Sequence, residues 1–274
     1  MKFDLFPIYE QSVPIDFSGN NKLGIHAKET TQRHAFGRRY IDNLGKVYRY
    51  GKSGGACYTG RGNVFYPAIN DATGAGGIDY AVLAAAAAAG DTVVKMTNTG
   101  SAAIAEDFLV GGQILIKPTE TVTDAQVMER TVIANSYAAA TSGVCSITLS
   151  APLETAVTTS NYAFVMPSHW TDVRYANVGQ GGFTFAGLAA TYISASGYYF
   201  WTQVYGPCWI CPQASMGGTV ATYGLYRTCY WRHDGSIDYH GNIGSNVTDQ
   251  IAGYILDNNA SANGSTVIML TCDK

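Results

Sequence analysis

The sequence predicts an all-β protein, mainly antiparallel, with a β-sandwich or jelly-roll-like body. Short segments rich in Val, Ile, Thr, Tyr and Phe recur along the 274 residues, and Gly-rich turns separate them at the spacing typical of a sandwich or barrel. Glycine (31 residues) and tyrosine (19 residues) are abundant, whereas Lys and Glu are scarce, which excludes a coiled coil. Hydrophobic residues make up 47% of the chain, so it can bury a sizeable core and is not disordered.

Residues 1–35 are predicted to form an extended N-terminal arm. Pro7, Pro14 and the turn signal at 18–21 argue against a helix. An extended apolar segment without a local partner must lie on another surface, either its own domain or a neighbouring subunit. We therefore take its large apolar side chains as candidate partner-binding residues: Phe3, Phe6, Ile8, Tyr9, Ile15 and Phe17.

Residues 36–274 are predicted to form a single β-rich body, with a possible sub-boundary near 74–90. Its first strand is expected within 46–51, where Val47 and Arg49 alternate with Tyr48 and Tyr50. The alanine-rich stretch at 79–89 predicts one short helix, because alanine is the best helix former. The alternative is an irregular alanine-rich link.

The later strands are predicted from short β-branched and aromatic runs that are bounded by turn residues. Pro118 and Pro167 each end one of these runs. The expected strands are 91–98, 113–117, 131–134, 144–149, 163–166, 182–185, 198–207, 220–230 and 266–271.

The charge and hydropathy patterns exclude two classes of partner. Lys and Arg number 17 against 20 Asp and Glu, a net charge of −3, and Asp42 interrupts the densest basic cluster, at 38–52. Because phosphate binding needs clustered basic side chains, no nucleic-acid partner is expected. The longest apolar run, at 80–89, is about half the 20 residues that a membrane-spanning helix needs. The first five residues lack the apolar stretch of a signal peptide, so we expect neither a cleaved leader nor a membrane segment.

Cys208 and Cys211 form a C-x-x-C pair. A structural zinc site needs four ligands, usually from two such pairs, and neither a second pair nor a His at finger spacing is present. A thioredoxin-type motif opens a helix in a βαβ unit, whereas this pair lies in a β-rich aromatic stretch and precedes Pro212. We therefore expect two buried, reduced thiols on opposite faces of a strand, without zinc and without redox activity.

His233, Asp234, Asp238 and His240 fall within eight residues. Such a cluster could bind a metal or act as acid and base. The Asp-Gly-Ser turn at 234–236 favours instead a hairpin whose polar side chains lie at an exposed tip. The chain carries no nucleophile elbow, phosphate-binding loop or zinc-protease motif. We therefore expect no enzyme activity, no cofactor and no metal.

Three motifs, in order along the chain, carry a family resemblance. They read G-K-V-Y-R-Y at 45–50, A-G-D-T-V-V at 89–94 and Y-F-W-T-Q-V-Y-G-P at 199–207. With these segments the chain resembles, from about residue 37 to its end, a family of tailed-bacteriophage virion proteins that are encoded beside the major capsid protein and identified as head decoration or cement proteins. The C-x-x-C pair directly after 206–207 departs from the family pattern.

The resemblance implies a capsid decoration protein of the virion, made in the host bacterial cytoplasm, which binds the major capsid protein on the outer face of the head and stabilises the shell. It also implies self-association as a homotrimer. Tyr48, Arg49 and Tyr50, within the first motif, join the candidate partner-binding residues. An apolar arm is suited to strand addition on a partner's sheet edge, and tyrosine-rich surfaces are typical of interfaces.

Two rival hypotheses remain. The first is a tail or fibre-associated adhesin that binds host carbohydrate on exposed Tyr and Trp side chains, and the second is a depolymerase with scattered carboxylates. A decoration protein should show a broad apolar face, whereas a carbohydrate binder should show an exposed aromatic cleft.

We expect the purified protein to form a symmetric oligomer, a trimer. Low charge and aromatic-rich strands leave apolar surface that a monomer would expose to water. Light scattering at micromolar concentration measures the oligomeric state, and a monomer there would contradict this expectation.

Overall fold

The computed structural model describes residues 24–66, 81–117, 127–177, 184–212, 227–239, 247–258 and 266–272. The six apolar side chains predicted for the arm lie outside these ranges. The chain divides into two compact units. Unit 1 consists of 1–66 and 172–274, and unit 2 consists of 67–171. The described residues of the two units bury separate apolar cores.

The described residues form strands and one short 3-10 helix, η1 (His169–Thr171), and every pairing between named strands is antiparallel. The predicted fold class, mainly antiparallel all-β with a sandwich-like body, is therefore confirmed. In these ranges no helix is long and apolar enough to cross a membrane. The strands of unit 1 are β1 (Arg39–Ile41), β2 (Val47–Lys52), β3 (Asn63–Phe65), β10 (Val173–Tyr175), β11 (Phe185–Ala189), β12 (Tyr199–Trp209), β13 (Thr228–Arg232), β14 (Ile237–Tyr239), β15 (Val247–Asn258) and β16 (Thr266–Thr271). The strands of unit 2 are β4 (Ala81–Val82), β5 (Val93–Thr97), β6 (Gln113–Lys117), β7 (Met128–Asn135), β8 (Val144–Leu149) and β9 (Tyr162–Met166).

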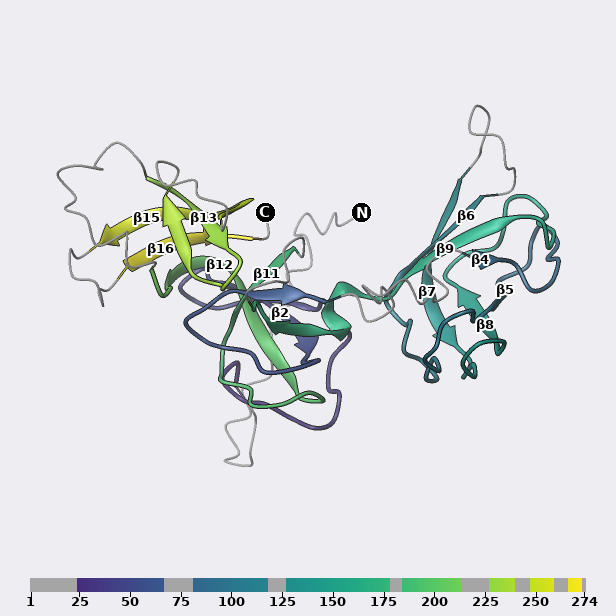
Figure 1. Cartoon of the computed structure of the whole chain (residues 1–274), viewed down its shortest axis with the longest axis horizontal. Coiled ribbons are helices and arrows are strands. Elements are labelled where there is room, and N and C mark those ends of the chain that lie inside the picture. Colours follow the sequence, from purple (N-terminus) through teal and green to yellow (C-terminus); the bar gives the residue numbers. More distant parts are fainter. Residues whose placement is uncertain are drawn as a thin grey trace, which may run out of the picture. The chain divides into compact units, whose positions relative to one another are not determined.

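The long strand β12 organises the sheet of unit 1, whose order is β10-β3-β11-β12-β16-β15-β13-β14. Figure 1 labels β11, β12, β16, β15 and β13 of this series, together with β2. Its first half pairs with β2 along one edge, where Trp201 is the partner of Tyr50, and with β11 along the other. Its second half pairs with β16, where Cys208 is the partner of Ile268. One strand thus joins two parts of the sheet, each with a cluster of buried aromatic or apolar side chains of its own.

The main core of unit 1 lies around Trp231, whose ring stacks on that of Phe185 with centroids 4.7 Å apart. Both rings are almost fully buried among aliphatic side chains. A second cluster joins Tyr48 and Tyr50 of β2 to Trp201 of β12. Burial of a large apolar side chain contributes roughly 1.5–3 kcal/mol, so these clusters account for the packing of β2, β11 and β13 on β12.

Unit 2 is a six-stranded sheet in the order β4-β9-β6-β7-β8-β5, which curls until its two ends meet. Leu83, just after β4, forms a bridge with Met96 of β5, and the Ala84 amide donates to the Lys95 carbonyl at 2.7 Å. Along β5, β6, β8 and β9 every second side chain is buried, as expected of strands round a common core. Figure 1 shows these strands round that core, which includes Leu83, Met96, Ile114, Ile116, Ile147, Leu149 and Val165.

The alanine-rich helix predicted at 79–89 is wrong over its described part, 81–89. Here the chain forms β4, isolated bridges and bends, so the alternative prediction, an irregular alanine-rich link, is correct. The Ala87 amide donates to the Val157 carbonyl at 3.0 Å, and the Val157 amide donates back at 2.8 Å. These hydrogen bonds to a distant segment of the same chain satisfy backbone groups that a helix would pair internally. The contact with the loop around Val157 therefore outweighs the helix propensity of alanine.

Unit 2 is inserted into the sheet of unit 1 between two adjacent strands. Phe65 of β3 is the register partner of Val173 of β10, and the Tyr66 amide donates to the Asp172 carbonyl at 2.9 Å. Arg174 donates two hydrogen bonds to the Asp172 carboxylate, at 2.6 and 2.8 Å, and its guanidinium lies 4.1 Å from the centre of the Tyr66 ring. The points where the chain leaves and re-enters unit 1 are therefore held together by unit 1 itself.

Residues 67–171, produced as a separate polypeptide, should fold without unit 1. Their core is closed by the bridge between Leu83 and Met96 and contains side chains of unit 2 alone. Circular dichroism should show a β spectrum with a cooperative thermal transition. A spectrum without strand signal, or a melt without a transition, would contradict independent folding.

Candidate functional site

An open hollow of about 410 Å³ lies on unit 1, beside the end of β12. This volume is within the range of about 300–1,000 Å³ that is usual for small-molecule sites. Three aromatic side chains, one guanidinium group and one thiol face it. Its lining residues are Tyr58, Thr59, Gly60, Arg61, Tyr175, Trp209 and Cys211.

The aromatic walls of the hollow are held in place and remain accessible. Trp209 is 46% exposed, and its ring lies so close to Gly60 that a Cβ there would be 2.3 Å from an indole carbon. Tyr58 is 39% exposed, and its ring meets that of Tyr175 edge to face, with centroids 4.6 Å apart. The glycine at position 60 thus lets the indole cover the loop at 58–61.

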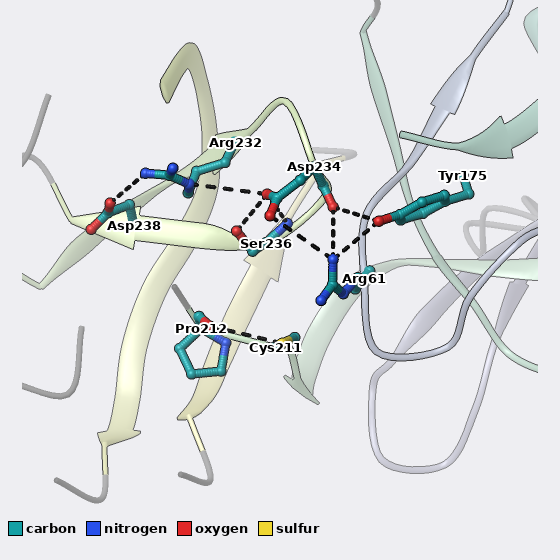
Figure 2. Close-up of polar contacts among 8 residues, drawn as sticks. All are labelled: Arg61, Tyr175, Cys211, Pro212, Arg232, Asp234, Ser236 and Asp238. Atoms are coloured by element: carbon teal, nitrogen blue, oxygen red, sulfur yellow. Dashed lines mark hydrogen bonds and ion pairs between the residues drawn. The ribbon is translucent and has the colours of Figure 1, made fainter. Parts of the chain in front are cut away.

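Arg61 is held at the wall of the hollow by the β13–β14 hairpin (Figure 2). Its Nη1 donates to the Tyr175 hydroxyl at 3.0 Å and to the Asp234 carbonyl at 3.5 Å, and it lies 3.9 Å from the Asp234 carboxylate. The Tyr175 hydroxyl donates to the same carbonyl at 3.1 Å. About 40% of the Arg61 side chain is exposed, so the guanidinium is positioned without being enclosed.

The loop that carries Tyr58 and Arg61 is shaped by the buried side chain of Asn63. The Asn63 amide nitrogen donates to the carbonyls of Tyr58 and Arg61, at 3.0 and 3.2 Å, and its oxygen accepts from the Tyr58 amide at 3.0 Å. The Cys211 amide donates to the Gly60 carbonyl at 2.8 Å, which ties the loop to the end of β12. Such a network fixes the hollow before any ligand arrives.

The hairpin predicted around 234–236 is confirmed. β13 and β14 pair in register from Cys229 to Trp231, and Gly235 has a left-handed backbone (φ 72°) in the turn between them. The prediction that its polar residues lie at an exposed tip is wrong for Ser236, which is 2% exposed, and for Asp238, which is fully buried and accepts a 2.9 Å bond from Arg232. The described residues contain no cluster of side chains that could hold a metal, and His240 lies outside them.

The cysteines of the C-x-x-C pair occupy different surroundings. Cys208 lies in β12 with its side chain in the core, and burial raises the pKa of its thiol to about 12. Cys211 lies beyond the end of β12, is partly exposed and lines the hollow, so the prediction of two buried thiols on opposite faces of a strand is wrong for Cys211. Burial also raises the pKa of Cys57 and of Cys229, the latter to about 12. All six cysteines are free thiols, and the buried ones are kept in their unreactive protonated form.

The residues taken from the first motif are found in the structure, whereas those of the arm lie outside the described ranges. Tyr48 and Tyr50 are 3% and 2% exposed, so their rings belong to the interior of unit 1 and not to its surface. Arg49 is partly exposed and donates to the Gly37 carbonyl at 3.0 Å. This motif therefore builds the fold, through the pairing of β2 with β12.

A second surface feature is an apolar sheet face, which we call the outer face, formed by Tyr205 of β12, Met269 of β16 and Ile251, Tyr254 and Leu256 of β15. Tyr254 pairs with Met269 in register, and on β12 and β16 the residues next to Tyr205 and Met269 are buried. Register shifts in β15 interrupt this alternation between Ile251 and Gly253 and between Ile255 and Asp257. Ile251, Tyr254 and Leu256 are 48%, 45% and 41% exposed. Apolar side chains gathered on one open sheet face are typical of a protein contact.

The residues of the hollow were not among the sequence-based candidates. Gly60 and Trp209 are in contact only because the loop at 58–61 runs along the end of β12. A contact between residues so far apart in the chain cannot be predicted from a local sequence pattern. The sequence allowed only a general expectation, that a carbohydrate binder should have an exposed aromatic cleft. In the same way, an apolar face was expected of a decoration protein, but the residues that form it were not predicted.

Replacing Asp238 with Asn should destabilise unit 1 by about 3 kcal/mol, because the poorly solvated Arg232 would lose its 2.9 Å ion pair and keep only the longer one with Asp234, at 4.0 Å. The Arg232 side chain is 12% exposed and that of Asp238 is fully buried. Urea unfolding followed by tryptophan fluorescence measures the loss. The matched control is Glu154→Gln, in an ion pair with Arg130 whose acid is 72% exposed, which should change stability by less than about 1 kcal/mol. Equal losses in both variants would contradict the role of burial.

No protein-family model, curated protein or solved structure matches this chain. Its function therefore has to be inferred from the chemistry of the hollow and the outer face and from the motifs in the sequence.

Proposed function

We propose that this chain is a structural, non-enzymatic protein of a tailed-phage virion, which binds the outer surface of the head shell and stabilises it. The observation that carries the proposal is the outer face of β12, β16 and β15, where large apolar side chains stay in contact with water. An apolar sheet face that is exposed to water is the kind of surface expected of a decoration protein.

The positions of the motif segments support the proposal. The segment at 45–50 leads into β2, the segment at 199–207 lies in β12, and the two strands are register partners from Tyr199 to Tyr205. Motifs whose residues pair with one another in adjacent strands of a sheet stabilise the fold and do not form a catalytic site. That is the pattern expected when a family shares a structural role.

The outer face is suited to contact with protein. Tyr205 and Tyr254 present large aromatic rings that have few rotamers to lose, and Met269 is an adaptable apolar neighbour. The proposed partners are the major capsid protein and further copies of this chain in a trimer. Many copies of the chain bind to one shell and stabilise its assembled state together, so a modest binding free energy for each copy is sufficient.

The N-terminal arm is proposed as the second attachment element. Its six apolar side chains would add along a sheet edge or groove of the shell or of a neighbouring subunit. Burying two or three of them at roughly 1.5–3 kcal/mol each would offset part of the cost of ordering the segment.

The proposal is tested with shells of the encoding phage that have been assembled without this protein. Tyr254→Asp combined with Leu256→Asp should reduce shell binding by about tenfold or more, because two charges would be buried against an apolar partner. The matched control is Ile133→Asp with Tyr137→Asp on unit 2, where both side chains are more than half exposed. Deletion of the first 20 residues should also weaken binding while the thermal melt of the protein is unchanged. Co-sedimentation measures all three.

Full binding by the outer-face variant and by the deletion variant together would overturn the proposal. Loss in the deletion variant alone would assign the attachment to the arm. Equal loss in the outer-face variant and its control would show that the outer face is not the contact.

A further inference from the structure

The hollow of unit 1 presents aromatic surface that the protein leaves uncovered. Trp209 rests on Gly60, and Tyr58 is supported at its edge by Tyr175 and by Tyr192, whose centroid lies 5.5 Å away. Tyr192 is itself 50% exposed. These rings therefore have a fixed orientation and an open face, which is the arrangement of a platform for a flat ligand.

Hydrogen-bond donors surround this platform. All hydrogen bonds that the Arg61 side chain makes to the described residues use Nη1, which leaves Nε and Nη2 of a 40%-exposed side chain available. In the same ranges, the indole N–H of Trp209 and the hydroxyl of Tyr58 make no hydrogen bond. A ligand in the hollow would thus meet apolar faces and polar edges together.

The charges beside the hollow balance. Arg61 lies 3.9 Å from the carboxylate of Asp234, and the neighbouring Arg232 is paired with the buried Asp238. Arg232 also lies 4.0 Å from the Asp234 carboxylate, so among the described residues these two cations and two anions balance. A charged ligand would have to displace the Asp234 pairing, whereas a neutral one would leave it intact.

We propose that this hollow is a saccharide-binding site, which takes one neutral pyranose ring of an oligosaccharide. The axial C–H face of the sugar stacks on Trp209 and Tyr58, and its hydroxyls accept from the free donors of Arg61. A purely apolar ligand would leave those donors without partners. A nucleobase could stack, but its backbone phosphate would need the net positive charge that the hollow lacks.

The site is organised in advance of binding. Asn63 holds the loop at 58–61 by three hydrogen bonds, and the Cys211 amide fixes Gly60 against the end of β12. A fixed site loses little conformational entropy on binding. Because the hollow is open and covers one ring only, a dissociation constant of about 0.1–1 mM is expected for each ring. Many copies on one particle would turn this weak contact into firm attachment to a glycan surface.

Two variants test the stacking separately from the fold. Trp209→Ala removes the platform, and because only about half of the ring is buried, its loss should lower the melting temperature by about 3–6 °C and leave the protein folded. Gly60→Ala keeps the indole but places a methyl group 2.3 Å from its present position, so the ring must tilt away. The matched control is Tyr137→Ala, which removes a 61%-exposed ring on unit 2.

The probes are maltohexaose, cellohexaose and chitohexaose, titrated against the full-length protein by saturation-transfer NMR and tryptophan fluorescence. At least one should bind, and Trp209→Ala should weaken that binding by about tenfold or more, Gly60→Ala by about threefold or more, and Tyr137→Ala not measurably. Absence of binding by all three at about 10 mM would overturn the proposal. So would binding that survives both hollow variants, or an oligothymidylate that binds as tightly as the best hexasaccharide.

The outcome is independent of shell attachment. The variants at Trp209 and Gly60 do not alter Tyr254 or Leu256 of the outer face. If the protein binds shells but no saccharide, the saccharide site is overturned and the proposed function stands. If it binds a saccharide but no shells, the proposed function is overturned and the saccharide site stands.

Discussion

The pairing of both edges of β12 is the constraint on which unit 1 depends. Its eleven residues are bonded to β2 and β11 in the first half and to β16 in the second, so each half belongs to a different group of strands. The side chains on one side of β12 enter the core, where Cys208 and Ile210 are buried, while Tyr205 and Trp209 face outward. The outer face and the hollow are therefore consequences of the same alternation along one strand.

The two binding surfaces differ in how the fold prepares them. The outer face is formed by three hydrogen-bonded strands, of which β15 has register shifts, and its apolar side chains are adaptable enough to follow the shape of a protein partner. The hollow needs a glycine under Trp209, an asparagine inside the loop and a charged hairpin beside it. A sheet thus provides area, whereas an irregular loop fixed by buried polar groups provides a specific shape, and unit 1 contains both.

Sequence patterns identified strands where local signals agree, and failed where distant contacts decide. The bounds 113–117, 144–149 and 266–271 coincide with β6, β8 and β16, because these runs alternate and end at turn residues. β15 was missed, since Gly253 and Asp257 resemble turn signals and the glycine in fact forms a bulge (φ 153°). The alanine run at 81–89 and the burial of Asp238 depend on partners elsewhere in the chain. The hollow joins residues about 150 positions apart, such as Gly60 and Trp209, and lies beyond any local pattern.

The insertion of unit 2 between β3 and β10 has a consequence for the order of events during synthesis. Phe65 must find Val173 across roughly a hundred residues, which is a costly loop to close for an unfolded chain. Unit 2 is continuous and emerges from the ribosome before β10, β12 and β16 exist, so it can collapse first. Its first and last strands are neighbours, with Ala81 opposite Ala163, so its collapse shortens the effective loop between Phe65 and Val173. Folding of the inserted unit would thereby bring β3 and β10 close together and speed the formation of the larger sheet.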